Sequence, residues 1–155
     1  MEHDFLIIAR ALHVIAVVLW IGGVAFVTTV LIPAIRCSQS PEDRLKIFEA
    51  LEGKFSFQAK LTTLLTGGSG FYMLYAMNTW LSMSWWIYLM VIIWAIFTVV
   101  LFVLEPLFLH RWFHQQAEKN NERTFFILQV MHVVLLSISL VAVFGGVAGV
   151  HGLFY

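Results

Sequence analysis

The sequence has little charge and almost no cysteine. Of its 155 residues, 12% are Asp, Glu, Lys or Arg, the formal net charge is zero, and Cys37 is the single cysteine. One cysteine excludes an intramolecular disulfide and a cysteine-only zinc site. A balanced charge without a basic tail argues against a nucleic-acid partner. The sequence also has no motif for a nucleophilic catalyst or a phosphate-binding loop.

Apolar residues fill most of the chain. They make up 61% of it, and the mean hydropathy is +0.88, which is typical of membrane proteins. About 20 apolar residues span a bilayer. We therefore predict an all-α fold: a single-domain integral membrane four-helix bundle over residues 1–155, with helices running alternately up and down. The expected helices cover about 5–35, 58–77, 85–110 and 124–154, and the first is expected to be an uncleaved helix.

The segment after the first apolar run is more polar and reads CSQSPEDRLKIFEALEGKFSF over residues 37–57. Ser40 is a good N-cap and Pro41 suits the first helical position. The apolar residues that follow recur near helical spacing. We expect an amphipathic helix on the cytoplasmic side, either lying on the membrane surface or covering the end of the bundle.

Basic residues gather in two links. All Lys and Arg residues except Arg10 lie in the 36–60 and 111–123 links, whereas the link between the second and third helices holds Trp80 and no charge. Cytoplasmic loops are enriched in Lys and Arg. This asymmetry predicts a protein of the cytoplasmic (inner) membrane with both charged links in the cytoplasm and both termini outside.

Two histidines lie inside apolar runs, His13 in the first and His132 in the fourth. An intramembrane ionisable side chain indicates a functional site unless a neighbouring helix satisfies it. If the first and fourth helices are antiparallel with level ends, His13 lies beside Gly146 and His132 beside Val27. The two histidines are then about 21 Å apart along the axis, so they predict two separate sites.

The outer candidate site centres on His13, with the glycine-rich end of the fourth helix opposite and His151 beyond it. Arg10 would either snorkel to the interface or pair with a haem propionate. The inner candidate site centres on His132, with Gln129 one turn away. Glu105 and His110 are its weaker candidate ligands, and each also has a simpler interpretation as a helix-end or interfacial residue.

A haem needs an axial nitrogen and a flat gap between helices. Histidines beside glycine-rich walls therefore predict one or two b-type haems, with His13 and His132 as axial ligands of the iron. The alternative is that both histidines are hydrogen-bonded to neighbouring helices and that the glycines only allow close helix packing.

The stretch ALHVIAVVLWIGGVAF, residues 11–26, resembles the first-helix pattern of HemJ-type protoporphyrinogen oxidases and CopD-type copper-resistance membrane proteins. The stretch EGKFSFQAKLTTLLTGGSGFYML, residues 52–74, is similar to their second segment. This resemblance implies four membrane helices and a haem ligand at His13. The third helix opens with WWIYLM, where the HemJ-type enzymes have an H-x-K element.

The leading functional hypothesis is a b-type cytochrome that exchanges electrons with quinone or a partner protein, and catalysis as an oxidoreductase is a further hypothesis. A second hypothesis is passage of copper or another metal along polar stepping sites. A third is oxidation of protoporphyrinogen, and a fourth is a purely structural subunit. The small and aromatic helix faces also allow homo-oligomers. The stepping sites of the metal hypothesis are His13, Glu105, Met131, His132 and His151.

Overall fold

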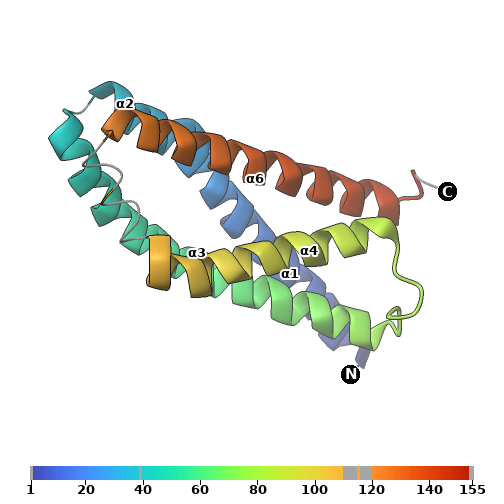
Figure 1. Cartoon of the computed structure of the whole chain (residues 1–155). Helices are drawn as coiled ribbons and strands as arrows, with labels where there is room; N and C mark the ends of the chain where they lie inside the picture. The colour runs from blue at the N-terminus through green and yellow to red at the C-terminus, as the bar shows by residue number, and fades with distance from the viewer. Residues whose placement is uncertain (1, 39, 110–114, 116–119, 154–155) are drawn as a thin grey trace.

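The computed structural model describes residues 2–38, 40–109, 115 and 120–153, and these residues form four helical segments without a strand (Figure 1). The all-α prediction is confirmed. The expected bounds agree with the observed ones to within a few residues, except at the start of the second helix. The segments are α1 (Glu2–Phe26) continued by η1 (Val27–Leu31) and α2 (Ile32–Ser38); α3 (Pro41–Ala76); α4 (Trp85–Val99) continued by η2 (Val100–Leu109); and α6 (Asn121–Val150).

Two of these segments contain a stretch of π-helix beside a proline. Proline lacks an N–H and its ring clashes with the carbonyl four residues earlier, so the helix must widen or bend. In η1 this occurs just before Pro33, where Thr28 and Thr29 donate their hydroxyls to Val24 O and Ala25 O. The second stretch, η2, contains Pro106.

The second segment is one uninterrupted helix. Ser40 caps α3 as expected, with its Oγ accepting a hydrogen bond from the Asp43 N–H at 3.3 Å. The expected boundary between a surface helix and a membrane helix near residue 57 is wrong, because α3 continues to Ala76. No proline occurs between Glu42 and Ala76, and a lone glycine such as Gly53 weakens a helix without ending it.

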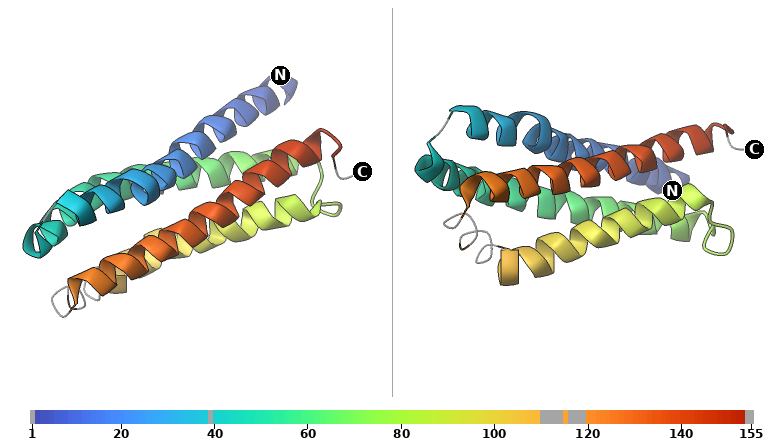
Figure 2. Two further views of the ribbon diagram at one scale, coloured as in Figure 1. Left: turned by 90° about the horizontal axis from the view of Figure 1, so that it is seen from above. Right: turned by 45° about the horizontal axis from the view of Figure 1, so that its top comes forward.

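The two chain ends lie at the same end of the molecule as the 77–84 link, and the junction between α2 and α3 lies at the opposite end (Figure 2). The helix α1 runs beside α3, with small residues such as Ala16, Ala59 and Thr63 buried at 2%, 2% and 0% exposure. Small residues allow helix backbones to approach closely. The helix α4 runs beside α6.

Two apolar clusters hold the helices together. The first joins α1, α4 and α6, and its Trp20 and Phe97 rings meet edge to face with centroids 4.9 Å apart. The second lies toward the α2–α3 junction, where Phe48 meets Phe125 edge to face at 5.7 Å. Aromatic pairs in this geometry add about 0.5–1.5 kcal/mol beyond the area that they bury.

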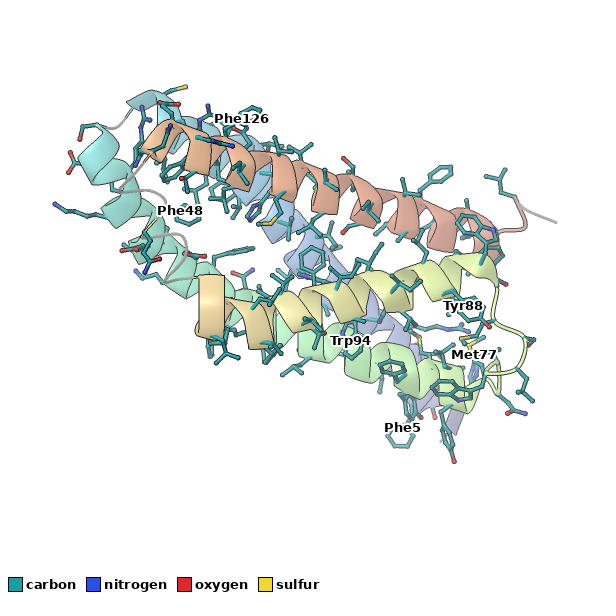
Figure 3. All side chains as sticks on the ribbon, viewed as in Figure 1. Phe5, Phe48, Met77, Tyr88, Trp94 and Phe126 are labelled. Carbon is teal, nitrogen blue, oxygen red and sulfur yellow. The ribbon has the colours of Figure 1, made fainter. Side chains whose placement is uncertain are left out.

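The outer surface is also apolar. Phe5 and Phe126, for example, are 58% and 57% exposed (Figure 3). Within the described residues, three stretches are long and apolar enough to cross a membrane: His3–Cys37, Trp85–Leu107 and Asn121–Val150. The helix α3 is not among them, since Lys60 and a run of threonines and glycines lower its hydropathy. A crossing by α3 stays a prediction.

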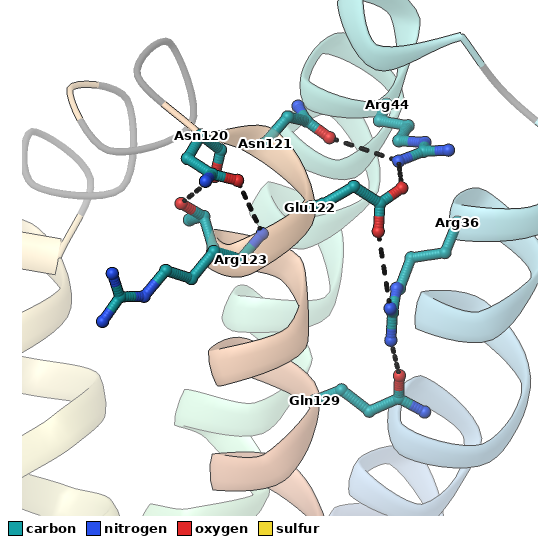
Figure 4. A network of polar contacts seen from close by, with 8 residues as sticks. Arg36, Arg44, Asn120, Asn121, Glu122, Arg123 and Gln129 are labelled. Atoms are coloured by element: carbon teal, nitrogen blue, oxygen red, sulfur yellow. Dashed lines mark hydrogen bonds and ion pairs between the residues drawn. The ribbon is translucent and has the colours of Figure 1, made fainter.

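A polar network ties α2, α3 and α6 together at the end opposite the termini (Figure 4). Arg36 donates to Gln129 Oε1 at 2.7 Å and lies 3.6 Å from a carboxylate oxygen of Glu122, which also binds Arg44. The predicted antiparallel alignment places Arg36 near residue 123, so it agrees with these contacts to within about two turns. Glu122 is 64% exposed, and exposed ion pairs contribute little to stability. We therefore infer that this network orients the ends of α2, α3 and α6 more than it stabilises the fold.

Candidate functional site

A cavity of about 350 Å³ lies between all four helical segments. Trp20 and Val24 reach it from α1, Phe48 and Phe55 from α3, and Phe97 from α4. Cavities of this size and apolar character are typical of ligand sites between the helices of a bundle. Its polar side chains are therefore the candidate functional groups, and they include His132, Glu52 and Glu105.

His132 stands on the cavity wall with a fixed ring. Its Nδ1 lies 2.9 Å from the Leu128 carbonyl oxygen. A carbonyl oxygen only accepts, so this contact places the proton on Nδ1 and leaves Nε2 as the free acceptor. Histidines that ligate metals are oriented in this way by a backbone carbonyl or carboxylate. His132 is thus chemically suited to hold an iron or to accept a proton.

The two glutamates on the wall have different surroundings. Glu105, on η2, accepts hydrogen bonds at one oxygen from Lys60 Nζ, at 3.1 Å, and from Ser56 Oγ. Glu52, on α3, lies one turn before Ser56 on the same helix face. Burial raises the pKa of the Glu52 carboxyl to about 7, and the negative charges of Glu105 and Glu49 add to this rise while Lys60 opposes it.

Trp20 lines the same cavity and has an unusual polar atom. The residue is 4% exposed, and its indole Nε1 is buried without a hydrogen-bond partner among the described residues. An unsatisfied buried donor costs about 1–3 kcal/mol. The residues that line the cavity are mostly apolar or aromatic, so the cavity favours an apolar ligand.

His13 lies elsewhere, in the contact between α1 and α3. Its Nδ1 is 3.1 Å from the Thr66 carbonyl oxygen and 3.0 Å from Ser69 Oγ. Its Cε1 lies only 3.2 Å from the point that a Cβ on Gly70 would occupy. His13 is therefore satisfied by α3 and does not line the cavity. The structure does not bring His13 and His132 together.

The glycines of α6 do not form a flat gap beside His13. A Cβ on Gly146 would lie 1.9 Å from Met90 Cε, and one on Gly149 would lie 2.5 Å from the Trp86 ring. These glycines admit side chains of α4, so the expected glycine-lined slot of the outer site is wrong. The physical reason is that bulky Trp and Met side chains of α4 occupy the space that the glycines leave.

The remaining predicted ligands are dispersed. His151 caps α6 at the exposed end, with Nδ1 2.7 Å from the Val147 carbonyl oxygen. Arg10 is exposed and lies 3.7 Å from the sulfur of Met77. His110 lies outside the described residues. Among the residues that the structure describes, no three His, Cys, Asp or Glu side chains gather in a way that could hold a metal ion.

The residues Glu52, Ser56 and Lys60 of α3 are not among the candidate site residues expected from the sequence. Their four-residue spacing is a signal for one helix face. It was hidden because residues up to 57 were expected to form a separate surface helix, which would have turned Glu52 toward water. The continuity of α3 instead carries Glu52 onto the cavity wall.

Comparisons of the chain with protein-family models, with curated proteins and with solved structures find no match. The resemblance to HemJ-type and CopD-type proteins, and the protoporphyrinogen oxidase activity that it suggests, remain predictions from the quoted stretches. The geometry of the cavity is therefore the basis for proposing a function.

Proposed function

We propose that this protein is a b-type cytochrome of the cytoplasmic membrane, which holds one haem in the cavity and transfers electrons to or from a quinone or partner protein. The observation that carries this proposal is the position of His132 on the wall of an aromatic cavity, with its Nδ1 2.9 Å from the Leu128 carbonyl oxygen. Haem supplies one-electron chemistry when it is bound.

The chain's own residues would divide the remaining work. His132 would hold the iron through Nε2, and the Leu128 carbonyl would keep the imidazole in the required tautomer. Trp20, Phe55 and Phe97 would exclude water, which raises the reduction potential by disfavouring the more charged ferric state. One haem is preferred to two because His132 lines the cavity and His13 does not.

The membrane arrangement in this proposal has four crossings. The C-terminal half of α3 would cross beside α1, since the two helices pack along their length. The charged links would lie in the cytoplasm and both termini outside. Support comes from the distribution of Lys and Arg and from the position of both chain ends at one end of the molecule.

The direct test is a reduced-minus-oxidised visible spectrum of the detergent-purified protein from haem-sufficient cells, with haem quantified per chain. A sharp b-type α band at about one haem per chain is expected. Absence of any haem absorption after reconstitution with added haemin would overturn the proposal.

A second candidate is a protein that binds quinone in the same cavity, favoured by Trp20 Nε1, which has no partner among the described residues. The indole N–H would donate to a quinone carbonyl oxygen, and Glu52 would lie on the same wall as a proton partner. This candidate predicts that bound quinone can be extracted from the purified wild type and from Trp94→Phe, but not from Trp20→Phe. Trp94 is a suitable control because its N–H already donates to the Thr63 carbonyl.

A further inference from the structure

Three residues of α3 face η2 in a row with four-residue spacing: Glu52, Ser56 and Lys60. The last two both donate to Oε1 of Glu105, and Ser56 is only 4% exposed. One oxygen of the Glu105 carboxylate therefore accepts from both a hydroxyl and an ammonium group. Glu52 stands at the start of the row and shares neither of these contacts with Glu105.

The charged groups around Glu52 do not offset the cost of ionising its buried carboxyl. Glu49 and Lys60 lie on its own helix, Glu105 approaches from η2, and His132 from α6. The cavity residues from α1 and α4 are apolar or aromatic, among them Val24 and Phe97. Two carboxyls that face one low-dielectric cavity do not both ionise easily, and their surroundings decide which one retains the proton.

We propose that Glu52 is a proton-binding site on the cavity wall, opposite a second carboxylate, Glu105, whose Oε1 is already bound by Ser56 and Lys60. The site is a property of the chain itself, whichever group fills the cavity. Where the proposed function also holds, negative charge added to the cavity by an electron would be offset by proton uptake at Glu52, so the two properties would be coupled.

The test is an infrared pH titration of the full chain in detergent, purified without haem. The protonated carboxyl C=O stretch reports Glu52 directly and is distinct from any imidazole signal. We expect a carboxyl band that disappears with a midpoint near pH 7, is absent in Glu52→Gln and persists in Glu122→Gln, a matched carboxyl outside the cavity. A wild-type spectrum without such a band, or a band that persists in Glu52→Gln, would overturn the proposal.

A second variant tests the role of the partner. Lys60→Met removes the cation from Glu105, and we expect the midpoint of the band to rise by about one to three pH units. Lys54→Met, which removes an exposed lysine of the same helix, should leave the midpoint unchanged. An unchanged midpoint in Lys60→Met would contradict the proposed arrangement of the two carboxyls. Because these measurements use protein without haem, a failure of the haem proposal does not affect them.

Discussion

His13 and His132 lie on helices long and apolar enough to cross a membrane, and each has a backbone carbonyl at Nδ1. They differ in what surrounds the rest of the ring. His13 is held against Thr66, Ser69 and Gly70, where α1 and α3 are in close contact. His132 borders a cavity of about 350 Å³. The difference teaches that the free space beside a histidine, more than its position in an apolar helix, separates a packing residue from a candidate ligand.

The largest expected effect comes from chemical rescue. His132→Gly should lower haem binding by more than about tenfold, since it removes the proposed axial ligand. Added imidazole should restore the b-type spectrum, because the cavity can admit a free ring. In His13→Gly, haem binding should persist and imidazole should have no effect. Visible titrations with haemin measure both variants. Rescue by imidazole in His13→Gly alone would show that His13, and not His132, is the ligand.

The helix against which His13 packs, α3, also packs closely against α4, so a larger side chain at that contact should reduce stability. A Cβ on Gly67 would lie 2.5 Å from the rigid Trp94 ring, whereas one on Gly68 has open space around it. We expect Gly67→Ala to reduce the free energy of unfolding by about 1–3 kcal/mol. Gly68→Ala should be neutral or stabilising, by up to about 1 kcal/mol. Unfolding in mixed detergent measures both, and equal effects would show that α3 and α4 are not closely packed there.

The Glu52 carboxyl on the cavity wall predicts that the stability of the protein depends on pH. Burial raises the pKa of Glu52 from its ordinary value to about 7. The folded state therefore binds a proton more tightly than the unfolded chain. Its contribution to stability is fully present below the unfolded pKa and is lost as pH rises through about 7. The thermal midpoint of the wild type should fall from pH 5 to pH 8 more steeply than that of Glu52→Gln. Parallel curves for the two proteins would contradict this assignment.

The smallest expected effect concerns the hydrogen bond of His13. Ser69→Ala removes one acceptor of the Nδ1–H and leaves the Thr66 carbonyl in place. A cost of about 0.5–1.5 kcal/mol in unfolding free energy is expected, without any change in haem content. Thr79→Ala, in the link after α3, provides a control outside the α1–α3 contact. Loss of haem in Ser69→Ala would assign the cofactor to His13 after all.

Much of the fold could be predicted from composition and periodicity. Long apolar runs locate α1, α4 and α6 because a bilayer-length helix needs little information beyond hydropathy. Ser40 and Pro41 mark the start of α3 through capping chemistry. The continuity of α3 could not be predicted, since the change from an amphipathic to a small-residue pattern near residue 57 suggests two elements although the backbone needs no break.

The candidate site was predicted in part. His132 and Glu105 could be placed at one depth by counting helical rise, and both line the cavity. The glycines of α6 were open to two interpretations, because a glycine admits either a cofactor or a neighbouring side chain. Only the rotational position of α4 decides that Trp86 and Met90 fill the space. That Trp20 Nε1 has no hydrogen-bond partner in the part of the chain that the structure describes also depends on three-dimensional contacts, which no spacing in the sequence reveals.

The measurement that tests the central claim most directly is the haem content per chain of His132→Ala beside that of His13→Ala, both expressed and purified with the wild type. The account predicts about one haem in the wild type, a similar content in His13→Ala, and loss in His132→Ala. Retention of haem in His132→Ala with loss in His13→Ala would contradict it.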